Sequence, residues 1–198
     1  FRLGDHPSKL VSLMGDNMRI AVIPNARDTQ EFERVRERVK REIEDLRAIG
    51  LDPYELDLKR YIGRAEDLKR ELHQYGGVWI LGGSVFVLRS RMQESGFDQI
   101  ITDLLRKDGL VYAGYSAGIC VLAPSLRGYE IVDPISEVTD GLRQRVMWDG
   151  LGILPYAFAP HYKSDHPESG MIDKMVEHME KERIPFKALK DGEVFIVD

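Results

Sequence analysis

The sequence predicts an α/β fold in which a mostly parallel sheet carries helices on both faces. In residues 18–124, short apolar segments alternate four times with segments of helical periodicity, and this alternation is typical of parallel strands joined by crossover helices. Glycine and proline close several of the apolar segments, as turns between strands and helices require. The chain has 198 residues, of which 43% are hydrophobic and 31% charged, and this is enough for one sizeable core. We therefore expect a single α/β domain over residues 1–198.

The first strand and the first helix have the clearest patterns. Residues 18–26 form an apolar run that ends at proline and asparagine, which indicates a buried strand. From Phe32 to Ile49, apolar side chains recur every three or four residues and charged side chains fill the other face, which predicts an amphipathic helix. Asp28 and Glu31 resemble a capping box at the start of this helix, and Gly50 is expected to end it.

The elements that follow keep the same alternation up to residue 113. Strands are expected at residues 54–58, 77–81 and 110–113, and helices at residues 65–75, 84–94 and 97–107. Gly82 and Gly83 directly follow the strand 77–81, and a serine corner follows the strand 110–113. Sites in open parallel sheets lie beyond the carboxyl ends of the strands. The sequence therefore predicts a functional site where these two strands end.

After residue 124 the pattern is less regular, because glycine and proline interrupt it repeatedly. A helix is expected again at residues 168–182. A terminal hairpin is expected from residues 185–189 and 193–197, joined by a turn at Asp191-Gly192. Because the chain starts at Phe1 and ends in an apolar, strand-like segment, we expect both ends to lie within a longer protein.

The composition argues against several classes of partner. A net charge of -5 argues against nucleic acid, since phosphate binding requires a basic face. The single cysteine, Cys120, excludes an internal disulfide framework and argues against a thiolate zinc site, so neither a metal nor an organic cofactor is expected. No apolar run approaches 18 residues and no signal-peptide pattern is present. We expect a cytoplasmic protein without a membrane partner, which the low cysteine content fits.

The serine corner is the strongest functional signal. Residues 114–118, GYSAG, match G-x-S-x-G between a strand-like and a helix-like segment, the context in which this motif marks a nucleophile. A Cβ at Gly114 or Gly118 would clash with adjacent strands, while the hydroxyl of Ser116 would project from the sheet edge. The backbone N–H of Ala117 would face the same space and stabilise an oxyanion. The competing explanation is a tight packing joint between helix and sheet.

A nucleophilic serine requires a base, and two of the five histidines suit this role. The other three lie near the N-terminus or in charged helical segments, where solvent-exposed positions are expected. His161 follows the apolar stretch 153–160 and is expected at the edge of the sheet, so we favour it over His166, which lies between Asp165 and Pro167. Hydrogen-bonded loop histidines are the alternative for both.

The acid that orients the base has two candidates. Glu130 and Asp133 both lie between Ser116 and His161, so either gives the chain order serine, acid, histidine. Asp133 precedes Pro134 and is explained equally well by a turn. Glu130 lies in a short strand-like stretch where a carboxylate has less structural reason, so we favour it and keep Asp133 as the alternative.

Four segments together resemble the peptidase E (alpha-aspartyl dipeptidase) and cyanophycinase family of serine peptidases. In chain order they are GGVWILGGSVFVL, YAGYSAGICVLAP, YEIVDP and APHYKSDHPES, and the likeness extends from about residue 18 to the end. The resemblance implies a flavodoxin-like three-layer sandwich similar to that of class I glutamine amidotransferases. It also implies Ser116 as nucleophile, His161 as base, and an oxyanion hole formed by the N–H groups of Gly82, Gly83 and Ala117.

The chain also departs from the pattern of this family. Peptidase E has an asparagine after its glycine run where this chain has Ser84, and its triad acid is an aspartate. Other members use a glutamate, which adds weight to Glu130. The aspartyl dipeptidases carry an arginine downstream of the histidine, whereas residues 169–181 here contain lysines and no arginine, so a preference for aspartyl substrates is not expected. Ser84, Tyr115 and Lys163 are the candidates for substrate binding.

The expected function is that of a serine peptidase, in which residues 1–198 form one catalytic domain that hydrolyses short peptides through an acyl-enzyme. A homodimer is a further expectation, with residues 85–92 and Trp148 at the contact, although core packing also explains this apolar segment. One alternative is an α/β-hydrolase-like esterase, which shares the serine motif, although no HGGG-type segment is present. The other is a non-catalytic binding protein on the same fold.

Overall fold

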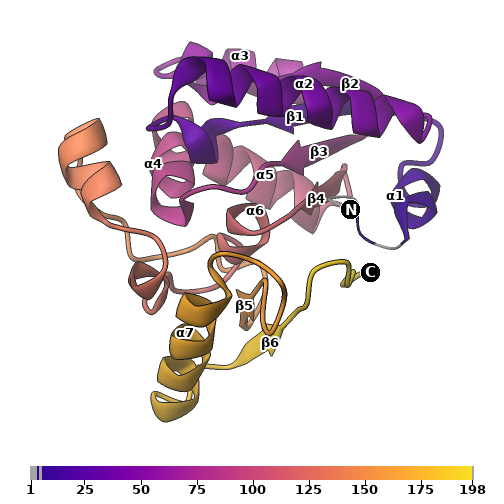
Figure 1. Ribbon diagram of the computed structural model, residues 1–198. Helices are drawn as coiled ribbons and strands as arrows, with labels where there is room; N and C mark the ends of the chain where they lie inside the picture. Colours follow the sequence, from indigo (N-terminus) through magenta and orange to yellow (C-terminus); the bar gives the residue numbers. More distant parts are fainter. Residues whose placement is uncertain (1–3, 5, 198) are drawn as a thin grey trace.

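The computed structural model describes residue 4 and residues 6–197, and within this range strands and helices alternate as predicted (Figure 1). Four strands form one parallel sheet in the order β2-β1-β3-β4. They are β1 (Arg19–Ile23), β2 (Asp52–Glu55), β3 (Gly77–Ile80) and β4 (Val111–Gly114). The chain moves from β1 to β2 on one side and then to β3 on the other, so the strand order reverses next to β1. Crevices at such a reversal are the usual binding sites of open α/β sheets.

Helices cover both faces of this sheet, and the alternation of side chains along β1 shows how. Ile20 and Val22 pack in a cluster with Val39 and Leu46 of α2 (Phe32–Ala48), against which α1 (Pro7–Leu13) also packs. Ala21 and Ile23 lie in a second cluster on the opposite face. That cluster is formed with α3 (Ala65–Leu72), α4 (Val85–Ser95), α5 (Phe97–Arg106) and α6 (Ala117–Cys120). The predicted α/β class with a parallel central sheet is confirmed.

A second, smaller sheet forms from the last part of the chain. β5 (Ala157–Ala159) and β6 (Phe186–Ala188) pair in parallel, and α7 (Ser169–Lys181) connects them; together they are the lower, orange-to-yellow part of Figure 1. The predicted terminal hairpin is wrong. The turn at Asp191-Gly192 exists, but β6 takes its backbone partners from β5, and residues 193–197 form no strand. Phe195 instead packs edge-on against Tyr156 and Phe158.

Two predicted boundaries differ from the structure for local reasons. β2 ends at Glu55 rather than residue 58, because Asp57 starts a short helical turn (Leu58–Tyr61) and accepts a hydrogen bond from the N–H of Lys59. The predicted capping box at Asp28 and Glu31 is wrong. Glu31 makes no side-chain cap, and the buried carboxylate of Asp28 accepts hydrogen bonds from Arg91 and Asn25 instead. Residues 125–156 hold only short turns, Tyr129–Ile131 and Glu137–Leu142.

The apolar segment expected at a dimer contact is inside the chain. Val85, Phe86, Val87, Leu88 and Met92 are all buried, and the ring of Trp148 meets Phe86 edge-on at 5.6 Å. α4 is apolar on most sides because the sheet and α5 pack on it from one side and the 125–156 region from another. These α4 side chains are therefore buried within this chain, as core packing explains, whereas Trp148 is half-buried.

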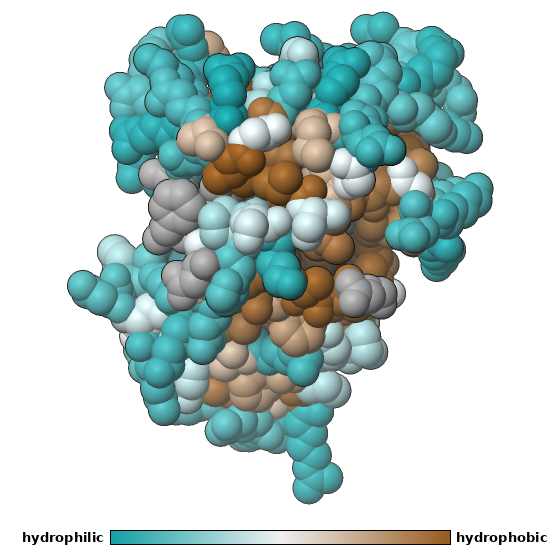
Figure 2. All heavy atoms as spheres, turned by 90° about the vertical axis from the view of Figure 1, so that its right-hand side faces the viewer, coloured by the Kyte–Doolittle hydropathy of each residue, from teal (hydrophilic) through white to brown (hydrophobic). Residues whose placement is uncertain are grey.

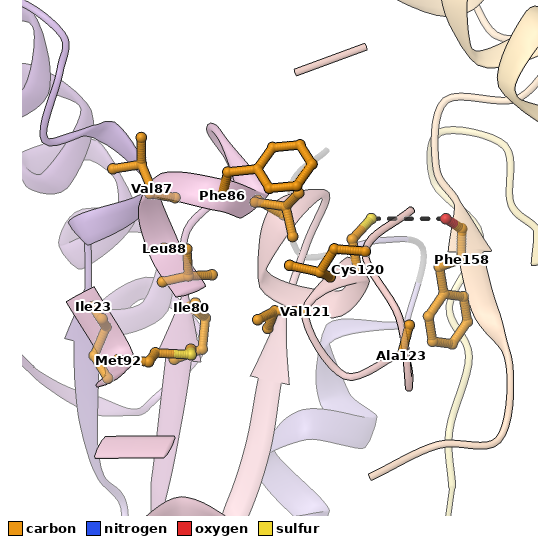
Figure 3. Packing of buried hydrophobic residues seen from close by; sticks show 14 of the residues in the cluster. Ile23, Ile80, Phe86, Val87, Leu88, Met92, Cys120, Val121, Ala123 and Phe158 are labelled. Carbon is orange, nitrogen blue, oxygen red and sulfur yellow. Dashed lines mark hydrogen bonds between the residues drawn. The ribbon is translucent and has the colours of Figure 1, made fainter. Parts of the chain in front are cut away.

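The core also joins α6 to the smaller sheet. Figure 3 shows Cys120 of α6 directed at the backbone of β5, where its Sγ lies 3.8 Å from the carbonyl oxygen of Phe158. The hydroxyl of Tyr129 donates to the same oxygen (2.8 Å) and accepts from the N–H of Phe158 (3.0 Å). Burial raises the pKa of the Cys120 thiol, so this cysteine is a packing residue, as the sequence suggested. Within the described residues, no helix has the length and apolarity needed to cross a bilayer.

Candidate active site

Ser116 occupies a strained corner between β4 and α6. Its backbone has φ 51° and ψ −122°, a conformation that costs a residue with a side chain on the order of 1–3 kcal/mol. The glycines on either side face the carbonyl oxygen of Ile80, at the end of β3. A Cβ at Gly114 would lie 2.7 Å from this oxygen and one at Gly118 would lie 2.5 Å from it. The prediction that a side chain at either position would clash with the adjacent strand is confirmed.

Unpaired backbone N–H groups surround this corner. A Cβ at Gly82 would lie 2.9 Å from the Cβ of Ser116, so the backbone of the two residues is in close contact. Gly83 has φ +153° and its missing side chain leaves room for the backbone of Ala26. Within the described part of the chain, the N–H groups of Gly82, Gly83 and Ala117 meet no hydrogen-bond acceptor. Gly82 approaches Ser116 closely and Ala117 follows Ser116 in the chain, so their N–H groups are candidate donors to a negatively charged oxygen there.

An open cavity of about 1570 Å³ lies at this corner, and both the predicted nucleophile and the predicted base line it. Ser116, Gly82 and Gly83 line it, as do His161 and His166 from the smaller sheet. The cavity continues along β4 to residues 192–197. Figure 2 shows the corresponding side of the molecule, with apolar side chains gathered across its middle and hydrophilic ones around them.

His161 lies just after β5 and contacts a carboxylate that the sequence analysis did not select. Its Nδ1 is 2.6 Å from Oδ1 of Asp191, and its side chain is only 16% exposed. Its ring stacks on that of His166, with the centroids 3.8 Å apart and the planes at 7°. The backbone of His161 has φ 61°, a second strained residue in this cavity. The sequence signal for Asp191 was the turn at Asp191-Gly192, which predicted a hairpin and not a site.

Backbone contacts place Asp191 beside His161. The N–H of Leu189 donates to the carbonyl of Ala159 (2.9 Å), and the N–H of Tyr162 donates to the carbonyl of Leu189 (3.0 Å). The hydroxyl of Ser164 accepts a hydrogen bond from the N–H of Asp191 at 2.8 Å. These contacts continue the parallel pairing of β5 with β6 past the ends of both strands. The loop with the histidine and the loop with the aspartate are thus held together.

The two acids favoured from the sequence do not contact His161. Glu130 is exposed and its carboxylate accepts from the N–H of Gly128 at 2.6 Å, away from the cavity. Asp133 lines the cavity, but its carboxylate accepts from the N–H of Val85 at 2.8 Å, at the first turn of α4. Burial raises the pKa of Asp133 to about 7; the Val85 hydrogen bond opposes this rise, and the nearby charges of Glu168 and Glu137 add to it. The expected geometry for Glu130 is not present, and Asp191 occupies that place.

The three residues expected to bind substrate lie in different surroundings. Ser84 lines the cavity, but its hydroxyl caps α4 by accepting from the N–H of Val87. The hydroxyl of Tyr115 donates to the buried carboxylate of Glu42 in α2, and burial raises the pKa of this tyrosine. Lys163 is exposed outside the cavity lining, with its ammonium over the ring of Tyr162. Ser84 and Tyr115 both line the cavity beside the free N–H groups, but each hydroxyl already has a hydrogen-bond partner.

Comparisons with known proteins agree with this fold. The model of peptidase family S51 matches residues 4–198. Peptidase E of Streptomyces coelicolor is 28% identical over 141 residues, which are 67% of this chain and 53% of the relative. An uncharacterized peptidase of Listeria monocytogenes is 25% identical over 146 residues, 73% of this chain and 66% of the relative. The chain thus spans between about half and two thirds of the length of these curated relatives.

Two solved structures share the fold. A crystal structure of a protein from Listeria monocytogenes EGD-e, named after peptidase E, aligns with a TM-score of 0.71 at 21% identity and covers 93% of this chain and 84% of its own. The structure of a peptidase from an acI-B1 actinobacterium aligns with a TM-score of 0.62 at 16% identity, over 87% of this chain and 69% of its own. Because the family model extends over nearly the whole sequence, the chain belongs to peptidase family S51.

Proposed function

We propose that this protein is a serine peptidase that cleaves short peptides, with Ser116 as nucleophile, His161 as general base and Asp191 as the acid that orients the base. The observation that carries the proposal is the cavity shared by Ser116 and His161, together with the carboxylate held on the far nitrogen of His161. Asp191 replaces Glu130 in this scheme, because Asp191 makes the required contact.

The contact with Asp191 fixes which nitrogen of His161 acts. A carboxylate 2.6 Å from Nδ1 stabilises the tautomer in which Nδ1 carries the proton and donates it to the carboxylate. Nε2 is then unprotonated and able to accept the proton of the Ser116 hydroxyl. The imidazolium that forms is stabilised by the negative charge of Asp191.

The chemical steps follow from these positions. As His161 removes its proton, Oγ of Ser116 attacks the carbonyl carbon of the peptide bond, and the carbonyl oxygen becomes negatively charged. The free N–H groups of Gly82, Gly83 and Ala117 donate hydrogen bonds to this oxygen. His161 then returns its proton to the leaving amine, which forms the acyl-enzyme. Water, activated by the same histidine, hydrolyses the ester and regenerates Ser116.

The substrate class rests on the relatives. The Streptomyces relative is named peptidase E and two Listeria relatives are named peptidases. The polar groups near Ser116 suit a short peptide: free backbone donors at one end of the site and the acidic side chains of Asp133 and Glu168 elsewhere in the lining. We propose no preference for an aspartyl residue, because residues 169–181, where the arginine for it is expected, contain lysines and no arginine.

A fluorophosphonate probe tests the nucleophile. We expect stoichiometric labelling of the wild-type chain and none of Ser116→Ala, whose fold should be unchanged by circular dichroism. Ser136→Ala is the matched control, because Ser136 is exposed and lies outside the cavity. Hydrolysis of a dipeptide panel and of a p-nitrophenyl ester, measured in parallel, separates a peptidase from an esterase. Equal labelling of wild type and Ser116→Ala contradicts the assignment of Ser116, and unlabelled wild type supports a binding protein instead.

A further inference from the structure

Three groups that bind transition metals meet at one side of the cavity. His161, His166 and Glu168 each offer one ligand atom, and these three atoms lie within 4.8 Å of one another. All three side chains are reachable from solvent, with exposures of 16%, 30% and 47%. His166 and Glu168 take no part in the proton transfers of the proposed mechanism; the N–H of Glu168 donates to Nδ1 of His166 at 3.3 Å.

The chemistry of this set points to zinc. Two imidazoles and one carboxylate are a donor set that Zn²⁺ takes with a fourth position left to water, and imidazole in general selects such metals over Mg²⁺ or Ca²⁺. Oδ1 of Asp191 lies 2.6 Å from Nδ1 of His161. In metal sites, a carboxylate on one ring nitrogen orients a histidine whose other nitrogen, here Nε2, binds the metal.

We propose that Zn²⁺ or a similar divalent transition metal binds at His161, His166 and Glu168 and blocks the site. Because Asp191 occupies Nδ1 of His161, the metal takes Nε2, the nitrogen that would otherwise accept the proton of Ser116. Binding of the metal depends only on the three side chains. The block of activity also rests on the proposed function, in which His161 is the general base for Ser116.

The stacking of the two histidines adds a second consequence. A nitrogen lone pair lies in the plane of its ring, and the two ring planes are nearly parallel at a centroid separation of 3.8 Å. One metal ion cannot lie in both planes at once, so at least one ring must tilt. Metal binding therefore breaks the stack, which changes the environment of both rings.

Calorimetric titration of this chain with ZnCl₂ tests the proposal. We expect one saturable site per chain, and at least a tenfold loss of affinity in His166→Asn and in Glu168→Gln. His73→Asn is the matched control, because His73 is exposed on the far helix α3 and makes only a local contact with Lys69. Ser116→Ala should bind zinc as the wild type does. No saturable binding, or equal affinity in wild type, His166→Asn and Glu168→Gln, overturns the proposal.

A measurement on the wild type alone avoids any dependence on the folding of variants. In a long-range ¹H–¹⁵N spectrum of the histidine rings, ZnCl₂ should shift His161 and His166 and leave His73 unchanged; shifts of all histidines alike would contradict a defined site. If zinc blocks the site, it should suppress fluorophosphonate labelling of Ser116. The zinc concentration that halves the labelling should equal the concentration that half-saturates binding. Binding without this suppression overturns the block, whereas a zinc-free chain that is never labelled contradicts the proposed function and not the metal site.

Discussion

Oδ1 of Asp191 lies 2.6 Å from Nδ1 of His161, although 30 residues separate the two in the chain. The contact joins the turn after β6 to the loop after β5, and it exists because these strands pair in parallel and end at the same edge. The candidate base is therefore oriented from the smaller sheet, while the candidate nucleophile comes from the larger one.

Asp191→Asn should abolish most of the activity and leave the fold intact. The amide donates to Nδ1 instead of accepting from it, so the histidine is held in the tautomer that has no free base toward Ser116. In a triad this change costs about 10⁴-fold in kcat. The rate of fluorophosphonate labelling measures it, with the melting temperature as the check on folding.

Glu130→Gln is the matched control for this change, since Glu130 is exposed and contacts only the N–H of Gly128. We expect it to keep the wild-type rate. Loss of activity in Glu130→Gln with full activity in Asp191→Asn would restore the assignment made from the sequence.

Ser164 is expected to act as a positioning residue. Its hydroxyl accepts from the N–H of Asp191 and so fixes the carboxylate relative to His161. Ser164→Ala should lower kcat about fivefold, in line with about 1 kcal/mol for one hydrogen bond, and leave KM unchanged. Ser164→Thr keeps the hydroxyl and should restore kcat. A rise in KM without a change in kcat, or no rescue by threonine, would contradict a positioning role.

The strained corner at Ser116 could be predicted from the sequence because its causes are local. Five consecutive residues determine it, and the two glycines are required by one neighbouring atom, the carbonyl oxygen of Ile80. The strand before Ser116 and the helix after it were visible in the same 15 residues. The free N–H groups at Gly82 and Gly83 follow from a glycine pair at the end of β3.

The acid could not be predicted in this way, because its position depends on a long-range pairing. Residues 185–197 have a hairpin pattern when considered alone, and the competing partner β5 is only three residues long. Once β6 pairs with β5, Asp191 reaches His161. The segment around Glu130 has a strand-like pattern. However, Gly128 has φ +99° and starts a short turn, in which the carboxylate of Glu130 accepts from the N–H of Gly128. Asp191 also follows His161 in the chain, so it does not fit the order serine, acid, histidine that the sequence analysis expected.

Gly118→Ala should destabilise the fold, although alanine favours helices. The new Cβ would lie 2.5 Å from the carbonyl oxygen of Ile80, a backbone atom in the central strand β3 that cannot move away cheaply. We expect a loss of about 1–3 kcal/mol in the free energy of unfolding, as for overpacked cores. Gly170→Ala in α7 is the control, because its Cβ meets nothing within 4 Å, and it should gain up to about 1 kcal/mol. Urea unfolding measures both, and equal stability of the two variants would refute the close approach.

Asp133 should make the stability of the protein depend on pH in an unusual direction. Its pKa is about 7 in the fold and near 3.9 in the unfolded chain, so the folded state binds the proton more tightly. Between about pH 4 and pH 7 the folded state therefore carries more protons than the unfolded state, and stability falls as the pH rises through this window. Below pH 4 both states are protonated and above pH 7 both are ionised, so the contribution is constant outside the window.

Asp133→Asn isolates the contribution of this one carboxylate. The amide oxygen can still accept from the N–H of Val85, and it carries no charge beside Glu168 and Glu137. The difference in unfolding free energy between Asp133→Asn and wild type should therefore grow in favour of the variant by roughly 2–4 kcal/mol from pH 4 to pH 7. Urea titrations at intervals of half a pH value measure this difference. A difference that stays constant over the range would show that Asp133 is ionised throughout, and the raised pKa would then be wrong.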